Sequence, residues 1–272
     1  MYVAIYLLEI YNNARSAAPV ALAAYSIAWA HKTAGLVDPT QHPLPRMIRE
    51  AAPRTLHYVS NKKEPINIAM ISKVVQVFGS ETASLQDLRL VAMMLIAFSA
   101  FLRYQELANL RFSDLIFHDQ YLQLFIESSK TDIHRDGVWV FVARINSPNC
   151  PVEALQRYVT RAGFQGYTEQ FIFRGITRHK VMAKRRLKAS NVPLAYTTAR
   201  ALLLKALGSL GYDTDLVGTH SLRSGGATAA AANRVEDRLF RKHGRWRSER
   251  CKDRYVKEDL EQKLIVTRNL GL

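Results

Sequence analysis

Residues 219–228 read Thr219-His220-Ser221-Leu222-Arg223-Ser224-Gly225-Gly226-Ala227-Thr228, and four alanines follow them. This composition predicts a helix that begins near His220 and packs closely on a neighbour through its small residues. His220 and Arg223 are three residues apart, so they share one helix face and can bind a common ligand. Two plainer interpretations stay open. Arg223 can belong to a helix start whose glycines and alanines serve only close packing. His220 can make only a local hydrogen bond at the helix N-terminus.

Upstream, residues 101–114 contain an arginine with an acidic residue placed to hold it. Arg103 follows the apolar stretch from Leu90 to Leu102, and Glu106 lies one helical turn further on. By itself Arg103 could be a solvated charge that ends an apolar helix. With Glu106 to fix its guanidinium, it becomes a candidate ligand-binding group.

Downstream, Trp246 lies nine residues before Tyr255, and His243 lies twelve before it. Tyr255 is one of 12 tyrosines, and a tryptophan suits an apolar core, so packing alone would explain both residues. Lys130 lies in the expected turn of a β-hairpin, where most lysines are merely solvated.

Together these residue types suit attack on a phosphodiester without a metal ion. During phosphoryl transfer, negative charge spreads over the non-bridging oxygens, and fixed cations can stabilise that charge. Arginine donates two parallel hydrogen bonds and keeps its proton. A tyrosine hydroxyl can act as the nucleophile, and lysine or histidine can move the protons.

The order and spacing of these residues resemble those of the tyrosine recombinases, the phage integrase family. The resemblance covers residues 64–260 and rests on the Arg-x-x-Glu box at Arg103, the His-x-x-Arg box at His220 and the register of Trp246 with Tyr255. The wording Arg-Ser-Gly-Gly-Ala-Thr, with His-Gly-Arg-Trp after it, looks most like recombinases of eukaryotic mobile elements of the Crypton or DIRS kind.

The resemblance implies a site-specific recombinase that forms a 3′-phosphotyrosyl intermediate. Tyr255 would be the nucleophile, the two boxed arginines would bind the non-bridging oxygens, and Lys130 would protonate the leaving oxygen. No cofactor and no metal is implied, because the covalent link stores the bond energy. The implied working form is a homo-tetramer on double-stranded DNA, with a helix at Leu260–Val266 docked on a neighbouring protomer. The implied catalytic set is Arg103, Lys130, His220, Arg223, Trp246 and Tyr255, with Glu106 and His243 in support.

The expected fold is mainly α with a small antiparallel β-sheet (α+β): a helical, SAM-like core-binding domain over residues 1–60 and a tyrosine recombinase catalytic domain over 64–272. Ser16 and Ser84 are the expected helix caps, and residues 38–45 are too proline-rich for a helix interior. Only about three helices fit before residue 60, where the family usually has four or five, so we expect a shortened N-terminal domain. Periodicity predicts helices over 2–13, 16–33, 44–58, 67–78, 84–101, 152–162, 197–210 and 221–233, and a hairpin that joins Tyr121–Ile126 to Val138–Val142.

The charge balance favours a nucleic-acid partner without naming one. The chain carries 38 Lys and Arg against 23 Asp and Glu, for a formal net charge of +15. The basic run at residues 178–188 can bind along a DNA backbone, but it can equally be a nuclear localisation signal or a solvated loop. Its candidate DNA-binding residues are Arg178, Lys180, Lys184, Arg185, Arg186 and Lys188.

Other classes of protein are disfavoured. Cys150 and Cys251 form no pair with metal-binding spacing, which argues against a zinc site and for a reducing compartment. The most apolar stretch is thirteen residues, short of the roughly 20 that a membrane span needs, and no secretory leader is recognisable. We therefore expect a protein that is neither membrane-bound nor secreted, in the nucleus of a eukaryote or the cytoplasm and nucleoid of a prokaryote.

Two other functions fit the same residues. A domesticated DNA-binding protein could keep the fold without cutting, although it would have no need of Tyr255 or Lys130. A type IB topoisomerase shares the chemistry but relaxes supercoils instead of exchanging strands. The wording of the two arginine boxes favours the recombinase.

Overall fold

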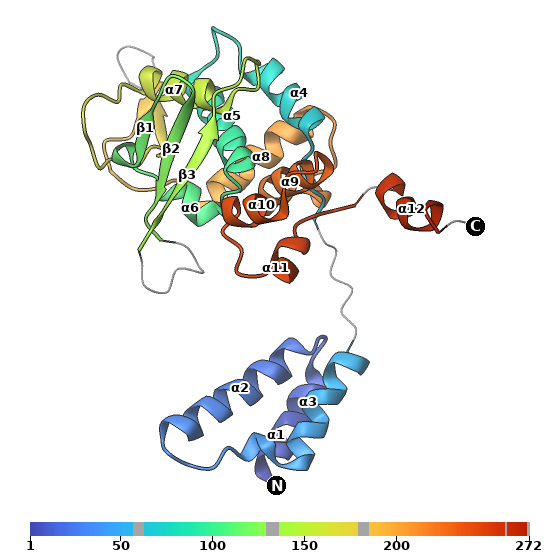
Figure 1. Ribbon diagram of the computed structural model, residues 1–272. Helices are drawn as coiled ribbons and strands as arrows, with labels where there is room; N and C mark the ends of the chain where they lie inside the picture. The colour runs from blue at the N-terminus through green and yellow to red at the C-terminus, as the bar shows by residue number, and fades with distance from the viewer. Residues whose placement is uncertain (57–62, 129–135, 179–184, 259, 271–272) are drawn as a thin grey trace. The chain divides into compact units, whose positions relative to one another are not determined.

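The computed structural model describes residues 1–56, 63–128, 136–178, 185–258 and 260–270. The chain forms two compact units, Met1–Asn61 and Lys62–Leu272 (Figure 1). Its architecture is mostly helical with small antiparallel sheets, which confirms the predicted fold class. Among the described residues, every helix is too short or too polar to cross a bilayer.

The first unit is built from α1 (Tyr2–Asn13), α2 (Ala18–Thr33) and α3 (Pro43–Thr55), which pack on one another. The expected cap at Ser16 is wrong, because α2 begins two residues later with Ala17 as its N-cap and a proline in its first turn. A proline suits that place, since the first-turn N–H groups lack helical partners in any case.

The proline-rich segment of this unit is also more regular than its sequence predicts. Asp38 accepts a hydrogen bond from the Thr40 N–H at 2.9 Å and begins a 3₁₀ turn, Pro39–Gln41. Helix α3 then begins at Pro43, so two prolines occupy its first turn. The prolines of residues 38–45 thus lie in a 3₁₀ turn and in the first turn of α3, and not in a helix interior, because prolines at a helix start remove no helical hydrogen bond.

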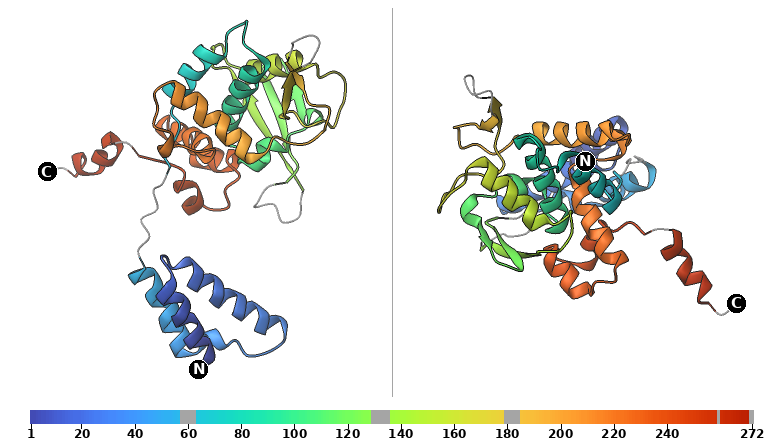
Figure 2. Two further views of the ribbon diagram at one scale, coloured as in Figure 1. Left: turned by 180° about the vertical axis from the view of Figure 1, so that it is seen from behind. Right: turned by 90° about the horizontal axis from the view of Figure 1, so that it is seen from above.

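In the second unit, a three-stranded antiparallel sheet in the order β1-β2-β3 lies beside a group of helices (Figures 1 and 2). The predicted hairpin is confirmed, with β2 paired to β3 in the register Leu124↔Val140. A second, two-stranded sheet of β4 and β5 was not predicted. The strands are β1 (Leu115–Phe117), β2 (Tyr121–Ile126), β3 (Val138–Ala143), β4 (Ile176–Arg178) and β5 (Arg185–Leu187).

Helix α5 (Leu85–Ser99) forms the centre of this unit's core. Its predicted cap is confirmed, since the Ser84 hydroxyl accepts from the Asp87 N–H at 3.3 Å. The helix is buried along most of its length and packs against α4, α7 and α9. The helices around it are α4 (Ile68–Phe78), α6 (Tyr104–Ala108), α7 (Pro151–Ala162), α8 (Tyr196–Ser209), α9 (His220–Ala232), α10 (Asp237–His243), α11 (Glu249–Asp253) and α12 (Leu260–Arg268).

Two glycines let α9 approach its neighbours backbone to backbone. A Cβ atom built on Gly225 would lie 2.0 Å from the Ile66 carbonyl oxygen, and one on Gly226 would lie 2.1 Å from that of Phe98. Real Cβ atoms do not approach so closely, so any side chain here would push α9 away from α5. The close packing expected from the glycine pair is thus present, and it fixes α9 against the end of α5.

We expect Gly226→Ala to lower the free energy of unfolding by about 3 kcal/mol, because the added methyl group meets a backbone carbonyl that cannot move aside. Urea denaturation measures the change. Gly208→Ala in α8 is the matched control, because its Cβ would meet only the Thr214 methyl group at 3.3 Å. Equal losses in the two variants would contradict the role assigned to this close approach.

Candidate active site

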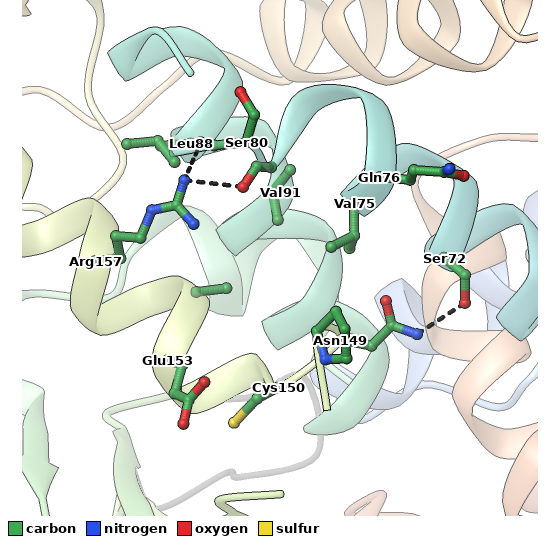
Figure 3. A pocket seen from close by; sticks show the side chains of 13 residues that line it. Ser72, Val75, Gln76, Ser80, Leu88, Val91, Asn149, Cys150, Glu153 and Arg157 are labelled. Atoms are coloured by element: carbon green, nitrogen blue, oxygen red, sulfur yellow. Dashed lines mark hydrogen bonds between the residues drawn. The ribbon is translucent and has the colours of Figure 1, made fainter. Parts of the chain in front are cut away.

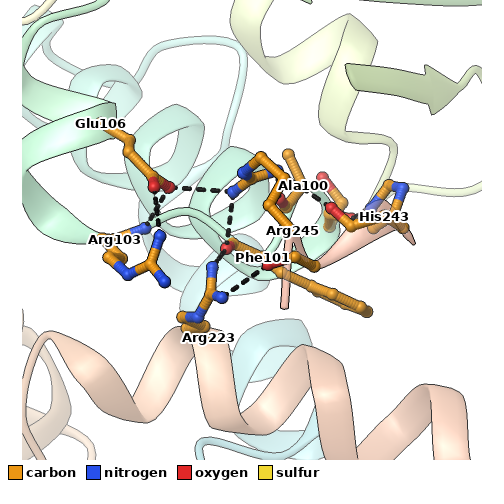
Figure 4. Close-up of polar contacts among 9 residues, drawn as sticks. Ala100, Phe101, Arg103, Glu106, Arg223, His243 and Arg245 are labelled. Carbon is orange, nitrogen blue, oxygen red and sulfur yellow. Dashed lines mark hydrogen bonds and ion pairs between the residues drawn. The ribbon is translucent and has the colours of Figure 1, made fainter. Parts of the chain in front are cut away.

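Arg103 begins α6 instead of simply ending the apolar helix before it. Its backbone N–H donates to Glu106 Oε2 at 2.9 Å, and its side-chain Nη1 donates to Glu106 Oε1 at 2.6 Å (Figure 4). The Arg103 side chain is 16% exposed, and that of Glu106 is 2% exposed. The turn that leads into it passes through Phe101, whose φ is 49°. Glu106 therefore holds the Arg103 guanidinium at the surface edge of a buried cluster.

Arg223, in the first turn of α9, is fully buried. Its Nη1 donates to the Phe101 carbonyl, and its Nη2 donates to the Gly244 carbonyl at 2.6 Å. Its guanidinium carbon lies 4.6 Å from the Trp246 ring centroid and 4.9 Å from that of Tyr255. Burial lowers the pKa of Arg223, and the positive charges of Arg103 and Arg245 lower it further. Arginine nevertheless stays protonated at neutral pH.

Trp246 is 6% exposed and packs with Phe101 and Phe240 in a small apolar cluster. Its ring centroid lies 5.4 Å from that of Tyr255, which is half-buried. Tyr255 follows α11 directly, and its carbonyl accepts a hydrogen bond from Thr228 Oγ1 of α9 at 3.4 Å. Trp246 is therefore a core residue that also borders Arg223, so packing and a place in the site are compatible.

The two histidines have different environments. His220 is exposed at the start of α9, yet partial burial lowers its pKa, and the charges of Arg223 and Arg103 lower it further. It should therefore be neutral near pH 7. His243 lies deeper, where its Nε2–H donates to the Ser99 carbonyl at 2.8 Å and its ring packs edge-on against Phe101. It anchors the end of α10 to the end of α5.

The cluster carries an excess of positive charge. Among the described residues whose charges act on Arg223, Glu106 supplies the single carboxylate. The guanidinium groups of Arg103, Arg223 and Arg245 lie around it. Fixed cations beside a half-buried tyrosine form a site suited to an anion such as a phosphate group.

Glu106 provides a pH-dependent test of this network. Burial is the largest single effect and raises its pKa, but Arg245, the Arg103 N–H and the Arg103 guanidinium together outweigh burial and lower the pKa below 4.5. A carboxylate with a lowered folded-state pKa contributes stability above its unfolded pKa and loses that contribution as the pH falls through its folded pKa.

We therefore expect Glu106→Gln to lower the free energy of unfolding by about 3 kcal/mol at pH 7, since it leaves buried guanidinium groups without a counter-charge. The gap to the wild type should narrow below about pH 4.5, as the wild-type carboxylate becomes protonated. Urea denaturation between pH 3 and pH 7 measures both. A gap that stayed constant across that range would argue against an ionised Glu106.

Three of the predicted residues, Lys130, Lys180 and Lys184, lie outside the described residues, so the structure does not place them. The rest of the basic run lies on a separate element, the β4–β5 hairpin, where Arg178 pairs with Arg185 through the backbone. Arg185, Arg186 and Lys188 are exposed there. The structure therefore brings together Arg103, Glu106, His220, Arg223, His243, Trp246 and Tyr255.

Sequence reasoning missed Arg245. This residue lies inside the Gly244-Arg245-Trp246 stretch, but its spacing gives no sign of a role. In the structure its Nη2 donates to Glu106 Oε2 at 2.9 Å and to the Phe101 carbonyl at 3.0 Å. An arginine beside a glycine, directly after a helix that ends in basic residues, was the only signal available.

A cavity of about 580 Å³ lies apart from the arginine cluster, between α4 and α7 (Figure 3). Among its described lining residues, Arg157 donates to the Gly79 carbonyl at 2.9 Å, and Asn149 donates to Ser72 Oγ at 2.7 Å. None of the residues predicted for the site lines it. Within the described parts of the chain, no three His, Cys, Asp or Glu side chains gather as metal ligands would.

The chain is similar in sequence to known proteins. Residues 72–262 match the model of the phage integrase family. An integrase/recombinase XerD homolog of Selenomonas ruminantium is 27% identical over 225 residues, which cover 82% of this chain and 62% of the relative. The chain thus spans less than two thirds of that relative's length.

Solved structures share the fold at low identity. The Tn1549 transposon integrase in complex with circular intermediate DNA is 12% identical with a TM-score of 0.60, over 97% of this chain and 83% of that one. A lambda integrase dimer bound to a COC′ core site is 18% identical with a TM-score of 0.55, over 94% and 63%. XerA recombinase is 13% identical with a TM-score of 0.55, over 100% and 90%.

Proposed function

Because the chain belongs to the phage integrase family, we propose that it is a site-specific recombinase that cuts and rejoins double-stranded DNA with Tyr255 as its nucleophile. One observation carries the proposal. The half-buried Tyr255 packs on Arg223, in a cluster where the positive charges of Arg103 and Arg245 also act. A nucleophile beside fixed cations is the arrangement that phosphoryl transfer requires when the charge is balanced by side chains.

The proposed reaction proceeds in two transfers. The Tyr255 hydroxyl gives its proton to the neutral His220 as its oxygen attacks the scissile phosphorus. The bond from phosphorus to the 5′ oxygen breaks, and the DNA is left attached through a 3′-phosphotyrosyl link. The 5′ oxygen takes up a proton, which Lys130 supplies by analogy with the family. In the second transfer a 5′-hydroxyl from a partner strand attacks the phosphotyrosine, which releases Tyr255 and rejoins the DNA. One phosphoester bond replaces another at each step.

His220 is exposed and the Arg103 side chain is 16% exposed, so we place the entry of the phosphate on their side. Arg223 has five N–H donors, and the Phe101 and Gly244 carbonyls engage two of them. Arg223 is fully buried, so a non-bridging oxygen can reach the remaining donors only if a neighbouring group moves. Because the Tyr255 ring packs 4.9 Å from the guanidinium carbon, we expect docking of DNA to shift Tyr255 relative to Arg223.

The remainder of the chain fits a DNA clamp. We propose that the unit Met1–Asn61 is the core-binding domain, and that the exposed Arg185, Arg186 and Lys188 of the β4–β5 hairpin contact the DNA backbone. Placement among the Crypton or DIRS recombinases would put the protein in a nucleus. That finer placement rests on the wording of the arginine boxes alone.

We also propose a homo-tetramer on DNA, joined in part by α12. This helix exposes Leu260 and Ile265 by 69% and 47%. An apolar groove of about 490 Å³ between β3 and α10 offers a place for such a helix, with Trp139, Phe141 and Leu239 on its walls. Trp139 and Phe141 are themselves exposed. Apolar side chains on both elements favour an exchange of α12 between copies.

Covalent trapping tests the proposed function. The purified protein is incubated with labelled nicked duplexes of random sequence in the absence of Mg²⁺, then denatured, and DNA that stays attached is sequenced. Attachment supports the recombinase. A gel shift without attachment favours a DNA-binding protein that does not cut, and relaxation of plasmid without recombinant product favours a type IB topoisomerase.

A further inference from the structure

Arg245 is a buried residue held in an uncommon backbone conformation. Its φ is 57°, in the left-handed region that non-glycine residues rarely adopt, and its side chain is 6% exposed. Such a conformation costs on the order of 1–3 kcal/mol and persists only where the surrounding contacts hold it. A glycine would relieve this backbone strain, but the glycine is the preceding residue, Gly244.

The side chain makes contacts that a turn alone does not require. Nη1 donates to the Ala100 carbonyl at 3.2 Å and to the His243 carbonyl at 3.0 Å. Nη2 donates to the Phe101 carbonyl at 3.0 Å and to Glu106 Oε2 at 2.9 Å (Figure 4). Both terminal nitrogens are thus occupied by acceptors of this chain, which leaves Arg245 poorly placed to bind a phosphate itself.

Two of these acceptors are shared with the proposed phosphate-binding arginines. Glu106 bonds Arg103 through Oε1 and Arg245 through Oε2. The Phe101 carbonyl accepts from both Arg223 and Arg245. Arg245 therefore donates to an acceptor that each of the two guanidinium groups also uses, and it connects these two acceptors through a single planar group.

We propose that Arg245 is a positioning residue that fixes the spacing between Arg103 and Arg223, and so the shape of the phosphate site. The expected effect on cleavage rests on the proposed function, whereas the positioning of the two arginines does not. If Arg245 is lost, Glu106 keeps its two bonds from Arg103, but the guanidinium that joins Glu106 to the Phe101 carbonyl is gone, so the distance between the two supports can vary. A displacement near 1 Å at a reacting centre can lower a rate by about 100-fold.

The test compares Arg245→Gly with Arg234→Gly. Glycine accepts a positive φ, so the first variant removes the guanidinium while relieving the backbone. Arg234 has a φ of 55° and is exposed, so it reproduces the same backbone change away from the cluster. Arg245→Lys is added because it keeps the charge but cannot span four acceptors.

Two readouts are taken. In ¹⁵N-arginine NMR, we expect the Nε–H groups of Arg103 and Arg223 to become mobile in Arg245→Gly and Arg245→Lys but not in Arg234→Gly. In single-turnover trapping on nicked duplex, we expect the two Arg245 variants to cleave about 100-fold more slowly than wild type, with Arg234→Gly unchanged.

Unchanged mobility of both arginines in folded Arg245→Gly would overturn the inference, whatever the cleavage rate. Mobile arginines with wild-type cleavage would overturn its catalytic consequence. If the wild type itself fails to attach to DNA, the proposed function fails, and the NMR readout still decides whether Arg245 positions the two arginines.

Discussion

Tyr255→Phe is expected to abolish covalent attachment of the protein to DNA while DNA binding is retained. The variant loses only the hydroxyl oxygen that the proposed mechanism uses as nucleophile. The phenyl ring keeps its contacts, because the Tyr255 ring packs 5.4 Å from Trp246 and 4.9 Å from the Arg223 guanidinium through its carbon face. Loss of a nucleophile typically lowers a rate by at least about 10⁴-fold.

Trapping on nicked duplex measures attachment, and a gel shift measures binding of the same duplex. Tyr167→Phe is the matched control, because Tyr167 is 83% exposed and belongs to no part of the cluster. It should attach to DNA as the wild type does. Attachment by Tyr255→Phe at the wild-type rate would refute the assignment of the nucleophile.

Arg223→Met is expected to lower the rate of cleavage by about 10³-fold or more while the free energy of unfolding changes by no more than about 2 kcal/mol. Methionine keeps an unbranched apolar stem against the Trp246 and Tyr255 rings. Removing the charge also relieves repulsion, because Arg103 and Arg245 both disfavour the charged form of Arg223. The main cost is the Gly244 carbonyl, which loses its donor.

This combination separates a catalytic role from a structural one. A buried cation that serves only the fold would, on removal, cost several kcal/mol, and urea denaturation would detect it. Arg223→Lys adds a control that keeps the charge without the planar fork, and we expect a rate between those of the wild type and Arg223→Met. A folded Arg223→Met that cleaved normally would exclude Arg223 from the phosphate site.

Sequence periodicity predicted most of the helices of this protein, because helix formation depends on residues three and four apart. The predicted helix near 197–210 appears as Tyr196–Ser209, and the Ser84 cap and the β2–β3 hairpin are present. The failures are local as well. The expected cap at Ser16 is wrong, because α2 begins at Ala18 with a proline in its first turn, where proline is tolerated.

The sequence predicted which residues form the candidate site, but not how they are held. The two spaced pairs, His220 with Arg223 and Trp246 with Tyr255, identified residues of which the fold brings Arg223, Trp246 and Tyr255 into contact. Their roles in catalysis stay predictions. Lys130 lies outside the described residues, so the fold adds nothing to its assignment.

By itself, the sequence determined which segments form helices and which residue types gather for phosphate chemistry, because both depend on local spacing. Only the tertiary structure decided how the guanidinium groups are held. Arg223 donates to the carbonyl of Phe101, 122 residues away, and Arg245 reaches Glu106 across 139 residues. Such partners have no periodic signature, since a backbone carbonyl is present at every residue. Packing of α9 on the end of α5 selects the ones that meet.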